Sequence, residues 1–409
     1  MFNKDIKVVV TGLGVISSLG SNFEQTWRNV VDGKNGVSKI TLFDASDSLT
    51  KVAAEVKEDV NLIVDGIIPK RILSQMTRAN KLSYVCAKQA VEDSNINMGS
   101  IDKERVCVIL GTSGTGFTSS EYFDHSNYIL KNMINSHTAW ISIAYKLKGP
   151  NFTVNTACAS ASYASGIAYN MIKNNEIDVA IVGGVEAMIS TLGIDGFNEL
   201  MALSEDNNSD YTACRPFDKN RSGFVMGEGA GVLIIESMEH ALKRGARIYC
   251  EFAGYEINSE SYNIVAPERN GEGMAKVMSK ALENVGISPE EVDYINAHGT
   301  STVLNDVYET RAIKKVFGKR AYDIPVSSTK SMLGHTLGAA GAVEGAVTVK
   351  SIQEGIVTPT INYTTRDPDC DLDYVPNKSR KHDINIAISN SFGFGGHNSV
   401  LVFKKCTCK

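Results

Sequence analysis

Residues 152–184 read FTVNTACASASYASGIAYNMIKNNEIDVAIVGG. The apolar run Phe152–Val154 and the β-branched run Val179–Val182 are short and end at small or polar residues, which is typical of buried strands. Between them, Ser160–Lys173 is rich in alanine and is predicted to form a helix. Strand, helix and strand in this order indicate an α/β protein with buried parallel strands.

The same alternation extends in both directions along the chain. Further strands are predicted at Ile6–Val10, Val106–Leu110, Gly231–Ile235, Val292–Ala297, Pro325–Ser328, Ile384–Ser389 and Ser399–Phe403, and further helices at Arg78–Ser94, Met274–Val285, Asp306–Phe317 and Gly338–Gln353. The pattern runs twice with a break near residue 250, although no residue-level repeat is visible. We therefore expect two similar halves, 1–250 and 251–409, which pack as one body because no low-complexity linker separates them.

Composition excludes several classes of protein. The 409 residues are 43% hydrophobic and 21% charged, unlike a disordered chain, a collagen-like rod or a coiled coil. A net charge of −5 without a long basic run argues against nucleic acid as the main partner. No apolar run approaches the roughly 18–20 residues of a membrane helix or forms a signal peptide, so we expect a cytoplasmic protein whose eight cysteines are reduced.

Three glycine-rich segments do not form a cofactor signature. Gly12–Ser17 has serine where a dinucleotide-binding loop has its third glycine, and we interpret it as a tight turn after the first strand. Gly111–Gly116 lacks the lysine of a phosphate-binding loop. Gly393–Gly396 allows the backbone to approach another group closely. Cys406 and Cys408 have no flanking histidine or cysteine pair, so we expect neither a cofactor nor a metal.

Cys158 is a candidate nucleophile, because it lies where a predicted strand ends and a predicted helix begins. The positive end of a helix dipole lowers the pKa of a thiol and favours the reactive thiolate. The neighbouring residues are small, so a substrate could reach the sulfur. A cysteine can also be a small buried hydrophobic residue, and this alternative stays open at this point.

Two histidines occur in matching contexts. His298 follows a predicted strand and precedes Gly299, and His335 follows Gly334 shortly after Lys330. The loops that follow strands are where α/β folds place their sites. Two such histidines together with a cysteine at a helix start favour thioester chemistry.

These residues lie in motifs that resemble the β-ketoacyl-acyl-carrier-protein synthases, closest to the type II elongating condensing enzymes of the thiolase superfamily. The resemblance covers essentially the whole chain. The motifs are, in order, Val10–Gly14, Thr156–Ser160, Arg215–Asp218, Gly227–Gly231, Asn296–Thr302, Ser327–Ser331 with Gly334 and His335, and Asn390–Gly396.

The resemblance implies two similar halves in five α/β/α/β/α layers and a decarboxylative Claisen condensation. Cys158 would carry the acyl group, while His298 and His335 would donate neutral Nε2–H groups to the enolate that forms from the malonyl unit. The backbone N–H groups of Cys158 and Phe394 would form the oxyanion hole. Lys330 and Glu344 match a charged pair that organises the histidines. Thr300 and Thr302 match two residues that hold the pantetheine arm, and Asp306 matches a structural acid.

The resemblance also implies partners. The expected substrates are acyl and malonyl groups on the phosphopantetheine of an acyl carrier protein, and the expected assembly is a homodimer. Carrier proteins are acidic and this chain is too, so a local basic patch must attract them. The candidate patch is Lys70, Arg71, Arg78 and Lys81.

Some positions depart from the family pattern and leave the pathway open between fatty acid and type II polyketide or polyene synthesis. Ser222 replaces an aspartate, Val303–Asn305 replaces a proline-containing stretch, and Thr77 replaces an acid. The chain could also be the catalytic half of a heterodimer with a chain-length factor. A non-catalytic chain-length factor would lack Cys158. A thiolase would carry a second cysteine in its catalytic set, and an initiating synthase would carry asparagine at position 335.

Overall fold

The computed structural model describes residues 6–114 and 127–406. The strands of its large sheet are β1 (Val8–Ile16), β4 (Val106–Gly111), β5 (Asn151–Val154), β6 (Val179–Glu186), β7 (Gly229–Ser237), β8 (Cys250–Ser259), β9 (Tyr294–Asn296), β10 (Val326–Ser327), β13 (Ile386–Gly393) and β14 (His397–Lys404). The order across the sheet is β10-β9-β13-β14-β8-β1-β7-β6-β4-β5. Two short hairpins pair β2 (Ser38–Lys39) with β3 (Val52–Ala53) and β11 (Ile356–Val357) with β12 (Arg380–Lys381).

The sheet contains the same topology twice. From the outer edge inward, the strands of the first half are β5-β4-β6-β7-β1, and those of the second are β10-β9-β13-β14-β8. Numbered within each half, both orders are 3-2-4-5-1. The halves join where Val8–Val10 of β1 pairs antiparallel with Cys250–Phe252 of β8. The predicted α/β class with two similar halves is therefore confirmed, whereas the boundary at residue 250 stays a prediction.

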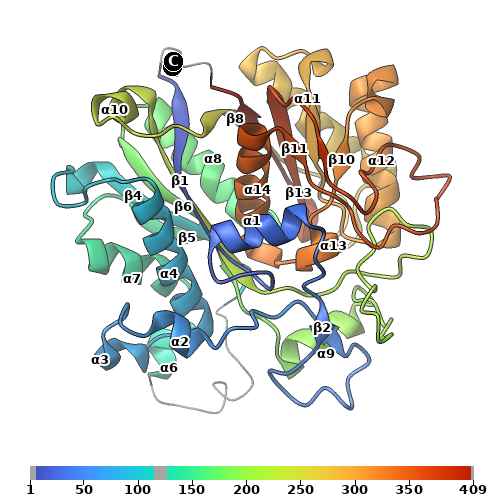
Figure 1. The fold of residues 1–409 in the computed structure, drawn as a ribbon, viewed down its shortest axis with the longest axis horizontal. Coiled ribbons are helices and arrows are strands. Elements are labelled where there is room, and N and C mark those ends of the chain that lie inside the picture. The colour runs from blue at the N-terminus through green and yellow to red at the C-terminus, as the bar shows by residue number, and fades with distance from the viewer. Residues whose placement is uncertain (1–5, 115–126, 407–409) are drawn as a thin grey trace.

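Helices complete five layers (Figure 1). The central layer is α8 (Ser160–Lys173) and α14 (Ala340–Glu354), which pack against each other and against both halves of the sheet. Outside the first half lie α4 (Arg78–Asp93) and α7 (Ser136–Tyr145), and outside the second lie α11 (Glu272–Val285) and α12 (Val303–Phe317). Shorter helices are α1 (Phe23–Val31), α2 (Val60–Val64), α3 (Lys70–Leu73), α6 (Tyr128–Asn132), α9 (Thr191–Glu199), α10 (Met238–Lys243) and α13 (Lys330–Leu333).

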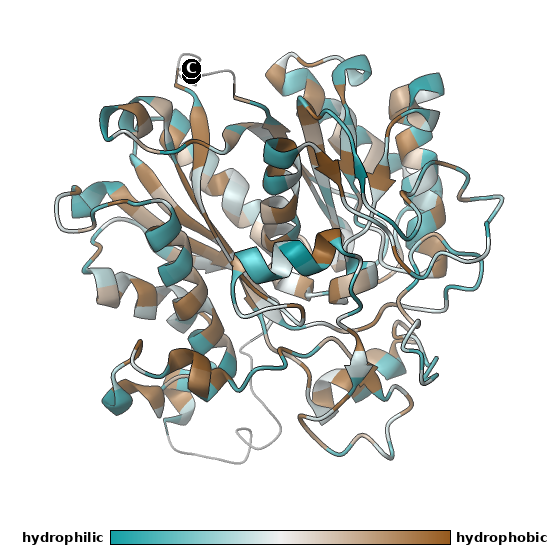
Figure 2. Cartoon of the chain, in the orientation of Figure 1, coloured by the Kyte–Doolittle hydropathy of each residue, from teal (hydrophilic) through white to brown (hydrophobic). Residues whose placement is uncertain are grey.

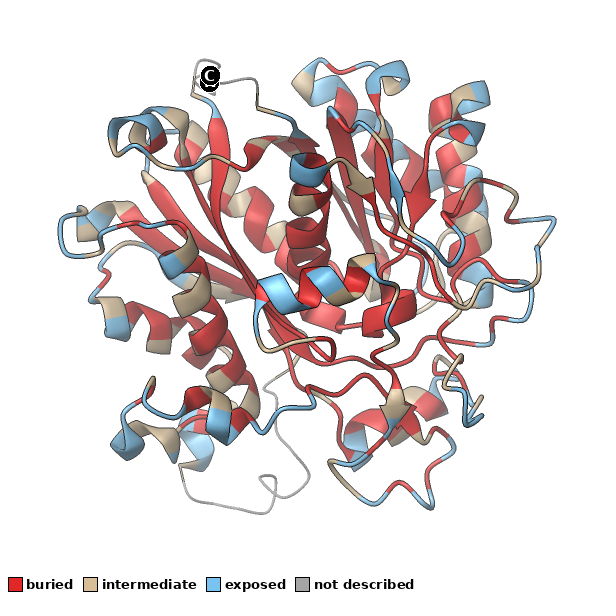
Figure 3. Cartoon of the chain, viewed as in Figure 1, coloured by how far each residue is buried: buried red, intermediate tan, exposed pale blue. Residues whose placement is uncertain are grey.

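The core follows the layers. Most strands that have helices on both faces are largely apolar, as the brown strands of Figure 2 show. In α14 most residues are buried on every side, because the two halves of the sheet enclose the helix (Figure 3). A charged side chain on a helix that is buried all round needs a partner. Glu344 lies on this helix and is therefore expected to be paired.

The prediction of a tight turn at Gly12–Ser17 is wrong. The strand β1 continues through these residues to Ile16, with a bulge between Val10 and Gly12. The glycines are needed because α4 crosses close to the strand. A Cβ atom at Gly12 would lie 2.3 Å from the carbonyl oxygen of Ala90, and one at Gly14 would lie 2.3 Å from that of Cys86.

The cysteines that the structure describes are free thiols. Part of the Gly111–Gly116 segment and Cys408 lie outside the described residues. Among the helices that are described, none is long and apolar enough to cross a membrane.

Candidate active site

Cys158 lies in the tight turn between β5 and α8. Ala157 before it has φ of +49°, an unusual value for a residue with a side chain, and it turns the chain sharply. The Ser160 hydroxyl stabilises this turn, since it donates to the Ala157 carbonyl at 2.6 Å and accepts from the Thr156 N–H at 2.9 Å. The strained turn and the start of α8 therefore hold the Cys158 backbone in place.

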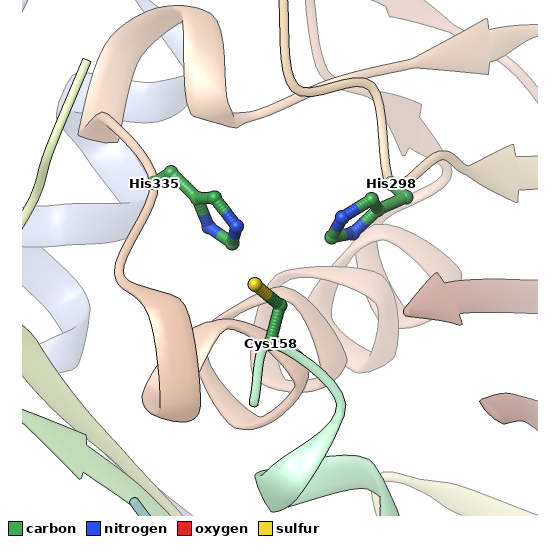
Figure 4. Close-up of side chains that lie close together, drawn as sticks. All are labelled: Cys158, His298 and His335. Atoms are coloured by element: carbon green, nitrogen blue, oxygen red, sulfur yellow. The ribbon is translucent and has the colours of Figure 1, made fainter. Parts of the chain in front are cut away.

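Both predicted histidines face this cysteine, as Figure 4 shows. His298 follows β9 and His335 follows α13. The Cys158 sulfur and one nitrogen of each ring all lie within 4.8 Å of one another, and the three residues are buried. The two ring centroids are 5.3 Å apart and the ring planes meet at 83°. The structure thus brings together three residues that are 140 and 37 positions apart along the chain.

His335 has a defined tautomer. Its Nδ1 atom accepts a hydrogen bond from the Leu337 N–H at 3.2 Å, so the neutral ring carries its proton on Nε2. Burial lowers the pKa of His335 well below its usual value, and the nearby Lys330 lowers it further. The ring is therefore neutral near pH 7 and offers an Nε2–H donor.

His298 is placed by a carboxylate that the sequence analysis missed. The backbone N–H groups of His298 and Gly299 donate to the two oxygens of Glu309, each at 2.8 Å, and the Asn390 amide donates at 3.0 Å. Burial, followed by Lys330 and His335, lowers the pKa of His298 well below its usual value. Glu309 lies three residues after Asp306 on one face of a helix, and this spacing could have indicated a second buried acid.

Lys330 and Glu344 form the expected charged pair. The Lys330 ammonium contacts a Glu344 carboxylate oxygen, and both side chains are buried. Burial raises the pKa of Glu344 to about 7, although Lys330 opposes this shift. The positive charge of Lys330 is one reason that both histidines stay neutral.

The expected low pKa of Cys158 is wrong for this site. Burial raises the pKa of the thiol to about 12, although Lys330 and the backbone N–H groups of Phe394 and Cys158 favour the thiolate. Desolvation of a charge in a closed site outweighs the dipole of α8 and these contacts. The resting cysteine is therefore a thiol, and the two backbone N–H groups that contact its sulfur are the predicted oxyanion-hole donors.

A cavity of about 490 Å³ leads from this trio towards the surface. Thr300 and Thr302 line it, and their hydroxyls are 2.9 Å apart. The residues around its outer part are Val303, Leu304, Leu200 and Met201, all exposed. The cavity is largely apolar, with a few polar groups, which suits a long thin substrate with occasional polar atoms.

Phe394 also lines this cavity, where its ring packs against Phe197 with centroids 6.4 Å apart. The chain around Phe394 needs glycine on both sides. A Cβ atom at Gly393 would lie 2.9 Å from the Thr156 carbonyl oxygen, and Gly395 has φ of +80°. The close approach of Gly393 brings the Phe394 backbone to Cys158.

The other matched or departing positions contact neighbouring segments of the chain. Asp306 is buried, accepts from the Phe217 N–H at 2.8 Å and lies 3.6 Å from Arg221. Ser222 lines the cavity and its hydroxyl lies 2.8 Å from that of Ser204. Thr77 caps α4, because its side chain accepts from the Asn80 N–H and the Asn80 side chain binds the Thr77 N–H.

The structure divides the candidate basic patch. Lys70 and Arg71 are exposed on α3. Arg78 instead forms an ion pair with the buried Glu228 at 2.6 Å, so its place in an exposed patch is a wrong prediction. Lys81 lies one turn further along α4, where its ammonium donates to Asn61 at 3.3 Å.

Within residues 6–114 and 127–406, the one cluster with metal-ligand spacing is Cys158, His298 and His335. The Leu337 N–H occupies Nδ1 of His335, so the Nε2 atom that would face a metal bears a proton. This arrangement favours hydrogen-bond donation over metal ligation.

Comparison with known protein families gives two matches. Residues 5–241 match the β-ketoacyl synthase N-terminal domain, and residues 249–364 match the β-ketoacyl synthase C-terminal domain.

Relatives match over the full length. A 3-oxoacyl-[acyl-carrier-protein] synthase 2 from Synechocystis sp. is 44% identical over 411 residues, covering 98% of each chain. A protein of the same name from Staphylococcus aureus is 41% identical and covers 98% of this chain and 99% of its own. Among solved structures, a type II polyketide ketosynthase bound to its acyl-carrier protein is similar with a TM-score of 0.89 at 34% identity, covering 98% of this chain and 99% of that one.

Proposed function

This chain belongs to the β-ketoacyl synthase family and is a condensing acyltransferase, and from this premise we propose which residues carry each step. The observation that carries the proposal is the buried trio of Cys158, His298 and His335 at the inner end of the cavity. One thiol and two neutral donors meet the needs of a thioester transfer followed by formation of an enolate.

In the first half-reaction, the Cys158 sulfur attacks the carbonyl carbon of an acyl thioester. The oxyanion that forms accepts hydrogen bonds from the N–H groups of Cys158 and Phe394. The carbon–sulfur bond to pantetheine then breaks, and the departing sulfur takes up the proton that Cys158 loses. Because the resting thiol has a pKa near 12, this proton leaves only as the new bond forms.

In the second half-reaction, a malonyl thioester enters the cavity. His298 and His335 donate Nε2–H bonds to its thioester oxygen. Loss of carbon dioxide leaves the electron pair as an enolate, which attacks the acyl carbon on Cys158. The Cys158 sulfur leaves as a thiolate and takes up a proton from water. Burial and Lys330 support this role, since they keep both rings neutral.

The proposed carrier of both substrates is an acyl carrier protein, with Thr300 and Thr302 along the pantetheine arm. The solved ketosynthase bound to its acyl-carrier protein supports this partner. Intact-mass measurement of the chain after incubation with a panel of acyl-carrier proteins tests the proposal. We expect one acyl group on Cys158, and the preferred chain length would separate fatty acid from polyketide synthesis. An unmodified chain across the whole panel would contradict it.

A homodimer is the proposed assembly. Strand β5 pairs with β4 on one side and, among the described residues, ends the sheet on the other. Its Phe152 and Val154 are partly exposed, so the edge is suited to pair with a second copy. The alternative is a heterodimer, as in a similar structure of a ketosynthase with a chain-length factor. Size-exclusion chromatography of the purified chain alone distinguishes the homodimer from the heterodimer.

A cytoplasmic location of the protein stays a prediction.

Reversal of charge at Lys70 and Arg71 tests the carrier-protein patch. Glutamate at both positions should raise the KM for the carrier protein and reduce its dependence on salt, because attraction to an acidic partner is lost. Lys276 and Lys280 on α11 supply a charge-matched control, since α11 lies at the opposite corner of the molecule from α3 (Figure 1). An unchanged KM at low salt would reject the patch.

Phe394→Ala tests a gating role. The glycines around Phe394 allow its ring to swing away once an acyl chain is bound, while its N–H serves the oxyanion hole. Without the ring, malonyl groups should reach the histidines before Cys158 is loaded. We expect more carbon dioxide release from malonyl-carrier protein in the absence of an acyl donor. If a folded variant shows no increase over wild type, Phe394 serves packing alone.

A further inference from the structure

Glu186, the last residue of β6, is a buried carboxylate with no assigned role. Its side chain is fully buried. One oxygen, Oε2, accepts from the N–H of Ser113 and the N–H of Gly338, both at 3.0 Å, and from the Ser113 hydroxyl. The other oxygen, Oε1, is buried and has no partner among the described residues. A single oxygen therefore joins the segment after β4 to the segment that precedes α14.

The second of these segments also holds a catalytic histidine. The Leu337 N–H donates to Nδ1 of His335, and the next N–H along the chain, that of Gly338, donates to Glu186. Leu337 has φ of +43°, which is unfavourable for a leucine and persists only when surrounding contacts maintain it. The hydrogen bond to Glu186 is one of the contacts that hold the peptide between Leu337 and Gly338 in this strained conformation.

Close packing restricts the conformation of this segment as long as the carboxylate is present. A Cβ atom at Gly338 would lie 2.5 Å from the Ser113 nitrogen, so the two segments that share Oε2 also touch each other. Burial raises the pKa of Glu186 to about 7, although its hydrogen bonds oppose this. Oε2 accepts these hydrogen bonds when the carboxylate is ionised. It also accepts them in the protonated form, as long as the proton resides on Oε1.

We propose that Glu186 is a positioning residue for His335, since it holds the 337–338 peptide so that the Leu337 N–H stays on Nδ1 and the ring keeps its Nε2–H tautomer. Glu186 touches no reacting atom in this role. The inference rests on the proposed function, in which that Nε2–H donates to the enolate. Loss of the contact would allow the ring to exchange tautomers or rotate, and both changes would withdraw the donor.

The test compares Glu186→Met, which removes the acceptor, with Glu186→Gln, which keeps one acceptor oxygen. In the methionine variant we expect condensation kcat to fall about tenfold to hundredfold, because a misaligned donor loses much of its effect. Acylation of Cys158 should change by less than about threefold, since it does not use the donor. Glutamine should restore most of the condensation rate.

Ring-labelled ¹⁵N histidine NMR supplies the readout that a purely structural role would not change. Wild type should show His335 protonated on Nε2 alone, and the methionine variant should show both tautomers. Glu236→Met is the matched control. Glu236 is equally buried and lies on the neighbouring strand β7, where it pairs with Val179 at the opposite end of β6 from Glu186, and it binds Thr11, His240 and Arg244 instead. It should alter the melting temperature but not the His335 spectrum.

A single Nε2–H tautomer in Glu186→Met together with an unchanged condensation rate would overturn the inference. If the methionine variant does not fold, Glu186→Asp provides the same comparison, because its shorter side chain withdraws the oxygen from the Gly338 N–H. A wild-type protein that condenses no substrate would contradict the proposed function, whereas the tautomer measurement would still decide the role of Glu186.

Discussion

Replacement of Cys158 by alanine should reduce acyl transfer to background, a loss on the order of 10⁴-fold or more, as expected when a covalent nucleophile is removed. Among the described residues at the inner end of the cavity, Cys158 supplies the one thiol, and beside it lie the two neutral imidazole rings. Alanine fits the site, because Cys158 is 7% exposed and its neighbours are small. The melting temperature should therefore stay close to that of wild type.

The matched control for this variant is Cys107→Ala. Cys107 is also a buried free thiol, but it is the second residue of β4 and does not line the cavity. The Cys107→Ala variant should retain acyl transfer. The Cys158→Ala variant can retain decarboxylation of malonyl-carrier protein, because both histidines remain. Undiminished elongation by Cys158→Ala would remove the assignment of the nucleophile.

Alanine in place of either His298 or His335 should slow condensation by about 10²–10³-fold, the usual cost of losing one preorganised donor to a developing oxyanion. Acylation of Cys158 should be affected less, because its oxyanion is bound by backbone N–H groups. Single-turnover measurements of acylation and of carbon dioxide release separate the two steps. His382→Ala is a suitable control, since that ring binds the Asp293 carbonyl outside the cavity.

The same residues predict the pH dependence of condensation. The pKa values of both histidines lie well below the usual 6.5, so their neutral donor forms persist as the pH falls through 7 to 6. The condensation rate should therefore show no loss near pH 6.5 from their protonation. An acid limb with an apparent pKa near 6.5 that disappears in His335→Ala would contradict the assigned environment of His335. A wild-type rate of condensation in that variant would contradict its role as a donor.

Local sequence patterns predicted most of the elements, because each depended on nearby residues. The helix Ser160–Lys173 was predicted with the bounds that the structure shows, since its alanines favour a helix and Asn174 follows them. Gly12 and Gly183 were instead interpreted as strand ends. Both lie inside strands, because glycine there accommodates a neighbouring backbone that is distant in sequence.

The sequence by itself determined the α/β class, the doubled pattern and the identity of the cysteine and two histidines, because strand and helix periods and loop motifs are local properties. Only the tertiary structure decided how these groups behave. Burial between the two halves made Cys158 a thiol of high pKa, and the Leu337 N–H set the tautomer of His335. Arg78 forms an ion pair with Glu228, and Glu186 and Glu309 accept hydrogen bonds from backbone N–H groups beside His335 and His298. Desolvation and hydrogen bonding depend on which distant segments meet, and no local pattern contains that information.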